Sequence, residues 1–216
     1  METKKVFNTI SVFLHPIFIP CLIAGLFLFG VNEAPWLDNQ ARWSLFSLIG
    51  TISTLMPISF LLLMQRFGII ESPHLHSRDE RSFALSVMVV SFGLICYILY
   101  VKINVSTAMN IAFTAVTITL IIANIANFID KISLHAIGMA GLAGILLYFI
   151  TEETNANIIL FDAFGFSLIL LGLSMTARLY LKAHTQYQVY AGAILGFFSG
   201  YFGAILGGMM FSENLI

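Results

Sequence analysis

Arg178 and His184 lie six residues apart in the segment between two long apolar stretches, with Lys182 between them. A charged side chain near the hydrocarbon core of a bilayer costs a few kcal/mol, so a lipid-facing helix gains nothing by ending in this group. Arginine binds oxyanions in bidentate geometry, and imidazole can act as a nucleophile or carry a proton. The group therefore indicates an anion site with a reactive imidazole. The alternative is a set of side chains that snorkel at a helix end.

Three polar segments are expected on one side of the membrane, because an even number of apolar spans separates each from the next. They are residues 74–81, 131–135 and 178–188. Cations that converge without matching acids bind an anion, and phosphate is the usual partner of arginine. The two imidazoles, His135 and His184, allow one to attack phosphorus while the other protonates the leaving oxygen.

Ser133 and His135 stand at the start of the fifth apolar span, and Lys131 comes just before them. Backbone N–H groups in the first turn of a helix have no partner within the helix, and the helix dipole is positive there. Both effects favour an anion beside the Ser133 hydroxyl, within reach of Lys131.

The elements that must position these residues are membrane spans. Of the 216 residues, 59% are hydrophobic and 10% are charged, and the mean hydropathy is +0.94, far from the values of soluble domains. A helix needs about 20 apolar residues to cross the hydrocarbon core. Seven stretches qualify, near residues 7–30, 44–64, 83–101, 107–128, 134–150, 158–177 and 189–210. We therefore predict an all-α fold, a polytopic transmembrane helix bundle of six or seven spans that forms one integral domain over residues 1–216.

Two of these spans carry small residues on one face. The glycines are Gly138, Gly141 and Gly144 in the fifth span and Gly192, Gly196 and Gly200 in the last. Such faces let a neighbouring helix approach closely, so they predict tight packing. Whether they also join two copies of the chain is left open.

The first span contains Pro16 and Pro20, which remove backbone donors and predict a kinked or partly re-entrant segment. His15 precedes the first of these prolines. We expect a hydrogen-bonded imidazole at the kink, and the alternative is a side chain that lines a polar cavity.

The composition excludes several other classes of protein. Cys21 and Cys96 lie inside apolar stretches without the spacing of a disulfide framework or a metal site. The net charge is −1, and no basic stripe alternates with aromatic residues, so nucleic acid is not an expected partner. His74 and His76 lie between the second and third apolar stretches and match no strong metal motif. A solvated loop is the preferred interpretation of this segment.

The segment from Ala177 onward resembles the third motif of the type 2 phosphatidic acid phosphatases (PAP2). That motif reads Ser-Arg, five residues, His, three residues, Asp, followed by a helix of small residues. This chain has Ala177-Arg178, five residues, His184, three residues and Gln188, followed by Val-Tyr-Ala-Gly-Ala-Ile-Leu-Gly. The arginine, the histidine and the helix pattern are kept, whereas the serine and the aspartate are replaced.

The other two motifs of the family are less well matched. Ile132-Ser133-Leu134-His135 is similar to Pro-Ser-Gly-His, and it retains the hydroxyl and the imidazole. The motif Lys, six residues, Arg-Pro is similar to His74, six residues, Arg81-Ser82, where only the arginine is shared. The PAP2-like region spans about residues 74–200.

The resemblance implies a role for each matched residue. His184 would be the nucleophile that forms a phosphohistidine, and His135 would be the general acid. Gln188 would orient the His184 ring by accepting its N–H, without the negative charge of an aspartate. The implied phosphate-binding residues are Arg178, Ser133 and Arg81, and Lys131 is added because it lies close by. The family needs no metal or other cofactor for this chemistry.

The expected function is that of a membrane phosphatase in phospholipid metabolism, which hydrolyses a lipid phosphate or an isoprenoid pyrophosphate among membrane lipids. Gln188, together with Leu134 in place of the family's glycine, keeps open a non-catalytic lipid-phosphate binding or transport protein on the same scaffold. A small transporter with an intramembrane site ranks last, since the spans hold almost no charged residues. The expected location is a bacterial inner (plasma) membrane. Lysine and arginine counts favour a cytoplasmic site, whereas the family suggests an extracytoplasmic one, so the side is left open.

Overall fold

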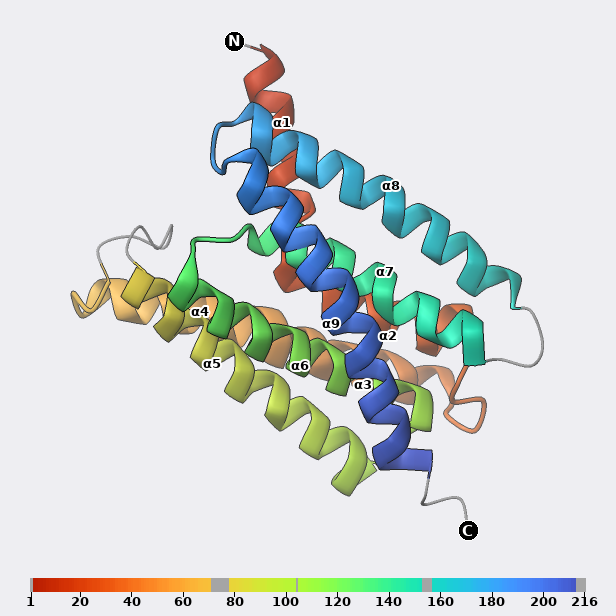
Figure 1. Cartoon of the computed structure of the whole chain (residues 1–216). Coiled ribbons are helices and arrows are strands. Elements are labelled where there is room, and N and C mark those ends of the chain that lie inside the picture. Colours follow the sequence, from red (N-terminus) through yellow and green to blue (C-terminus); the bar gives the residue numbers. More distant parts are fainter. Residues whose placement is uncertain (1, 71–77, 104, 153–156, 213–216) are drawn as a thin grey trace.

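The computed structural model describes residues 2–70, 78–103, 105–152 and 157–212, and these residues form helices and connections without a strand (Figure 1). The helices are α1 (Glu2–Phe13), η1 (Pro16–Phe18), α2 (Ile19–Gly25), η2 (Leu26–Gly30), α3 (Asn39–Gly50), η3 (Thr51–Leu55), α4 (Met56–Arg66), α5 (Arg78–Tyr97), η4 (Ile98–Ile103), α6 (Thr107–Ile129), α7 (Leu134–Glu152), α8 (Ile158–Tyr180) and α9 (Gln186–Ser212).

Seven helical segments in the described part of the chain are long and apolar enough to cross a membrane. They are Glu2–Gly30, Asn39–Arg66, Asp79–Ile103, Thr107–Ile129, Leu134–Glu152, Ile158–Tyr180 and Gln186–Phe211. The prediction of an all-helical, polytopic bundle is confirmed, and seven of the described helical segments qualify as spans by length and composition. The chain is an integral, multi-pass membrane protein.

The first span is broken at the predicted place. His15 has an extended backbone (φ −67°, ψ 131°), and the short 3-10 helix η1 follows with Pro16 at its first position. The His15 Nδ1 accepts a hydrogen bond from Ile17 N at 3.3 Å. The imidazole thus gives this N–H group an acceptor where the helix is interrupted. The chain then continues through α2 and η2, so the segment is kinked and still spans.

Gly141 and Gly144 of α7 pack against α9 where the two helices run side by side, whereas Gly138, predicted on the same face, lies against Pro16 and Ile19 instead. A Cβ atom at Gly196 would overlap the Ile137 carbonyl oxygen, and one at Gly200 would overlap the carbonyl oxygen of Gly141. Only glycine permits backbones to meet this closely. This packing brings the first turns of α7 and α9 together, and Ser133 N donates to Gln188 O at 3.1 Å.

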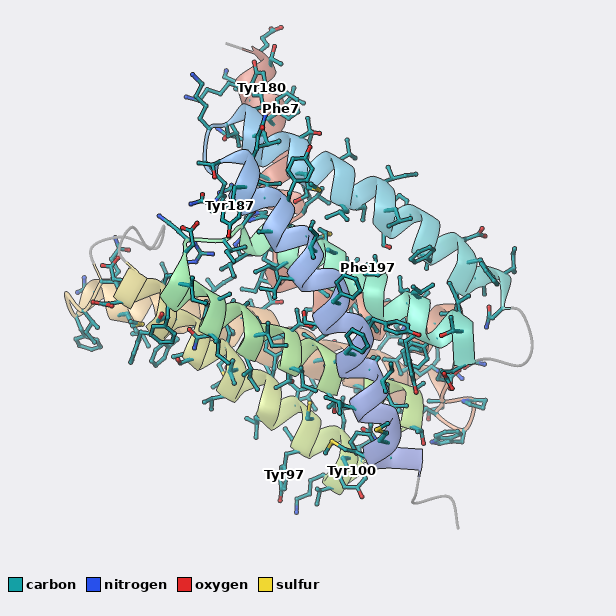
Figure 2. The ribbon with its side chains drawn as sticks, in the orientation of Figure 1. Phe7, Tyr97, Tyr100, Tyr180, Tyr187 and Phe197 are labelled. Carbon is teal, nitrogen blue, oxygen red and sulfur yellow. The ribbon has the colours of Figure 1, made fainter. Side chains whose placement is uncertain are left out.

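Aromatic side chains mark both ends of the bundle (Figure 2). At one end the ring centroids of Phe7 and Tyr180 are 4.3 Å apart, and Tyr187 is exposed nearby. At the other end Tyr97 and Tyr100 are half-exposed. Tyrosine prefers the two membrane interfaces, so this arrangement agrees with a bundle that crosses the bilayer between them.

One end of the bundle collects the segments that the sequence singled out. In Figure 1, α1 runs beside the C-terminal end of α8, and α9 begins next to them. The starts of α5 and α7 and the end of α6 belong to the same end, because successive spans run in opposite directions.

Candidate functional site

A cavity of about 770 Å³ lies at this end of the bundle. Its polar lining comes from α1 and the break after it, from the start of α5, from the α6–α7 connection and α7, and from α8 with the segment that follows it. The polar lining residues are Asn8, Ser11, His15, Arg81, Lys131, His135, Arg178 and His184. Five of the seven residues predicted for the site, Arg81, Lys131, His135, Arg178 and His184, therefore line one space.

The two arginines of the cavity are held by neutral oxygen atoms. Arg178 Nη1 donates to Ser11 Oγ at 2.9 Å, and Arg81 Nη2 donates to Ile132 O. The Nε atoms of both arginines are buried and have no acceptor among the described residues. A buried charged donor without a partner is costly. The Nε atoms themselves are not exposed to the cavity, so an anion there would reach them only after the guanidinium groups turn.

His184 is held by the side chain of Gln188. The His184 Nδ1 and the Gln188 Oε1 are 3.2 Å apart, and since an amide oxygen only accepts, Nδ1 donates. In the neutral ring this places the proton on Nδ1 and the lone pair on Nε2. Burial lowers the pKa of His184 from 6.5 to about 4; the charges of Arg178 and Arg81 act in the same direction, while hydrogen bonds to Gln188 and to the backbone of Lys131 oppose it. The imidazole is therefore neutral at pH 7, as a nucleophile requires.

His135 occupies the first turn of α7 and is 9% exposed. Its Nε2 donates to Ser11 O at 3.0 Å, and Ser11 Oγ lies 3.4 Å from the same atom. The ring of His15 meets that of His135 edge-on, with centroids 5.0 Å apart. His135 is thus fixed by the first span rather than by the segments that precede or follow α7.

Ser133 is fully buried and does not line the cavity. Its hydroxyl accepts from Ala136 N at 3.4 Å, the kind of bond that caps the start of a helix. Its role in phosphate binding stays a prediction. His74, which lines up with the lysine of the family's first motif, lies outside the described residues.

Three residues of the site stand outside the set of seven predicted from the sequence. Ser11 and His15 both line the cavity, and Asp130 accepts a hydrogen bond from Gln188. His15 is marked in the sequence by the Pro16 that follows it, with a polar cavity as one of its two interpretations, whereas no local pattern singles out Ser11 within an apolar span. For His15 both interpretations hold, because it is hydrogen-bonded at the kink and lines the polar cavity.

A second, apolar cavity of about 70 Å³ adjoins the first among η1, α5, α6 and α7. Its lining is apolar except for His15 and Thr119. Four residues line both cavities: His15, Ile17, Met88 and Leu134. The larger cavity with the arginines and histidines thus lies beside a small space lined by apolar side chains.

Among the described residues, no group of three or more His, Cys, Asp or Glu side chains is placed to hold a metal ion. Comparison of the chain with protein-family models, with curated proteins and with solved structures finds no match. A proposal of function must therefore rest on the residues of the cavity and their geometry.

Proposed function

We propose that the protein is a membrane phosphatase that hydrolyses a lipid phosphate or an isoprenoid pyrophosphate through a phosphohistidine intermediate. The observation that carries this proposal is the pair of arginines, Arg81 and Arg178, which line one cavity with His184 and His135 and whose buried Nε atoms have no partner among the described residues. Two arginines stabilise the charge of a transferring phosphoryl group. The neutral imidazole of His184 supplies the nucleophile.

The reaction has two steps. First, His184 Nε2 attacks phosphorus, a P–N bond forms and the P–O bond to the leaving group breaks. His135 must enter this step as an imidazolium, with the negative charge of the bound phosphate beside it; it gives its Nε2 proton to the leaving oxygen and becomes neutral. In the second step water attacks the same phosphorus, the P–N bond breaks, and His135 takes the water proton. Before the first step, the leaving oxygen replaces the Ser11 carbonyl as the partner of His135 Nε2.

The adjoining apolar cavity supports a lipid substrate. In this proposal the leaving oxygen of a phosphate bound between the arginines faces the smaller cavity, and the first carbon atoms beyond that oxygen occupy the space lined by Phe92, Val116 and Leu142. A water-soluble phosphate ester would gain nothing from such a space.

The same proposal places the protein in the inner, or plasma, membrane of a bacterium. Seven apolar helices support this placement, since proteins that span the bacterial outer membrane form β-barrels instead.

One observation favours a second candidate function, a non-catalytic lipid-phosphate binding or transport protein. The side chain in contact with the His184 ring is the amide of Gln188, which holds the tautomer but carries no charge. A binding protein needs the arginines and does not need a charged partner for the histidine.

Phosphate release separates the two functions. Purified wild type, His184→Ala and Gln188→Asp are incubated with a panel of lipid phosphates and isoprenoid pyrophosphates, with Arg66→Gln as a control, because Arg66 is exposed outside the cavity. The phosphatase proposal predicts release by wild type and by the control, and none by His184→Ala. If wild type releases no more phosphate than His184→Ala from every substrate of the panel, the enzyme proposal fails. Turnover by Gln188→Asp alone would establish the binding protein.

A further inference from the structure

The Gln188 side chain is held at both ends of its amide. Its Oε1 accepts from His184 Nδ1 and from Thr185 N, both at 3.2 Å, and its Nε2 donates to Asp130 Oδ1 at 3.2 Å. Donors meet the oxygen and an acceptor meets the nitrogen, so the amide has one satisfied orientation. In that orientation it presents an acceptor to the imidazole.

The carboxylate of Asp130 is fixed in its turn. Asp130 follows the last residue of α6, and its Oδ1 also accepts from Lys131 N at 2.6 Å. It does not line the cavity. Asp130 therefore acts on the site through Gln188, without touching a ligand there.

The backbone keeps the two segments in register. Ser133 N donates to Gln188 O at 3.1 Å, and a Cβ at Gly192 would stand 3.0 Å from Ser133 O. The α6–α7 connection thus rests on the first turns of α9, and the distance between Asp130 and Gln188 is set by main-chain contacts.

These contacts bear on the attack step. When the His184 Nε2 bonds to phosphorus while Nδ1 keeps its proton, the ring acquires a positive charge. In a Ser-His-Asp triad an aspartate in contact with the ring stabilises that charge and holds the tautomer. Here the contact is an amide, and the nearest carboxylate that bonds to the amide is that of Asp130.

We propose that Asp130 is the positioning residue of the nucleophile: through the Gln188 amide it fixes the orientation and tautomer of His184 and supplies the negative charge that a direct aspartate would supply. The effect of Asp130 on the rate rests on the proposed phosphatase function. The effect of Asp130 on the His184 tautomer in the ligand-free protein is independent of that function.

The test introduces Asp130→Asn, which keeps an oxygen acceptor and removes the charge, into wild type and into Gln188→Asp. The quantity compared is the change in kcat in each background. In wild type we expect kcat to fall about tenfold with KM nearly unchanged, since the charge acts on the ring from one amide away. In Gln188→Asp, where a carboxylate contacts the ring directly, the same change should leave kcat unchanged or raise it, because it removes repulsion between two carboxylates. Asp162→Asn, exposed on α8, is the matched control and should have no effect.

A residue that merely ties the α6–α7 connection to α9 would behave differently. Asp130→Asn would then leave kcat unchanged in wild type, or would lower it equally in both backgrounds, and either result overturns the proposal.

A second measurement remains decisive if no substrate is hydrolysed. The ¹⁵N shifts of the His184 ring report its tautomer in the ligand-free protein. We expect Nδ1–H in wild type and in Asp130→Asn, and a mixture with Nε2–H in Asp130→Leu, where the amide can rotate. An unchanged His184 tautomer in Asp130→Leu overturns the positioning role of Asp130. A wild-type protein that releases no phosphate overturns the phosphatase proposal and leaves the tautomer result unaffected.

Discussion

The arginines of the cavity indicate a binding site because buried hydrogen-bond donors on both side chains lack acceptors. Arg178 is tied by one nitrogen to Ser11, and Arg81 by one nitrogen to a backbone carbonyl, while their buried Nε atoms lack acceptors among the described residues. A salt bridge would have neutralised these donors within the fold. Held instead by neutral partners, they keep their charge for a ligand.

Replacement of Arg178 by glutamine should remove one charged donor while leaving a side chain that can still bond to Ser11. We expect kcat/KM for a lipid phosphate to fall about 10²–10³-fold, the usual loss for one donor to a transition-state oxyanion. Arg178→Lys should recover only part of the loss, because an ammonium group cannot bind in bidentate geometry. Steady-state phosphate release measures both, and Arg66→Gln is the control. Equal activity of Arg178→Gln and wild type would contradict the placement of phosphate beside Arg178.

His184 should remain neutral over the pH range in which most histidines become charged. Its folded pKa of about 4 lies below the ordinary 6.5, so between these values the unfolded chain binds a proton that the folded protein does not. The contribution of this group to stability is complete above pH 6.5 and is lost as the pH falls toward 4. An NMR titration of the His184 ring in detergent should give a midpoint near 4. A midpoint near 6.5 would contradict the burial of the ring in the free protein.

The sequence predicts the site residues that stand at span ends, because a charge at such a place is costly and therefore informative. Arg81, Arg178 and His184 were found in this way. Ser11 and Asp130 were not, since a serine within a span and an acid at an interface are both ordinary. Their importance comes from three-dimensional neighbours more than fifty residues away, which no local pattern encodes.

The helices α7 and α9 illustrate the same limit for whole elements. The spacing of their glycines predicts a close-packing face on each, and in the structure Gly141 and Gly144 of α7 meet α9, while Gly138 meets the first span. The pattern does not say that the two faces meet, because periodicity fixes which side of a helix is small but not its neighbour. Their contact is what carries His135 and the Gln188 backbone to the same place.

Gly196→Ala tests this contact. The added Cβ would overlap the Ile137 carbonyl oxygen and stand 2.7 Å from Ile137 Cα, both of which are backbone and cannot rotate away. We expect a loss of roughly 1–3 kcal/mol, as for other overpacked interiors, seen as a lower midpoint of thermal unfolding in detergent. The matched control is Gly165→Ala on α8, where a Cβ meets nothing within 4 Å, and its midpoint should not fall. Equal midpoints for the two variants would contradict the backbone contact of α7 with α9.

Over the whole molecule, if all seven candidate helices cross the membrane, the cavity and the start of α1 lie on the same side of it. The connection after α8 lies on that side, and the connection between η2 and α3 lies on the other. This relation follows from the number of spans alone. It holds whichever side is cytoplasmic, so the side of the site can be determined from any exposed residue near the start of α1.

Cysteine labelling in intact cells tests this arrangement. In a background with Cys21 and Cys96 replaced by alanine, single cysteines are introduced at the exposed positions Lys5, Lys182 and Trp36. A membrane-impermeant maleimide should give the same result for Lys5→Cys and Lys182→Cys, and the opposite result for Trp36→Cys, because an even number of spans separates the first two and an odd number separates each from the third. Permeabilised cells should label all three. Labelling of Lys5→Cys and Lys182→Cys from opposite sides would show that one of the seven helices does not span, and would separate α1, with Ser11 and His15, from the histidines that it holds in place.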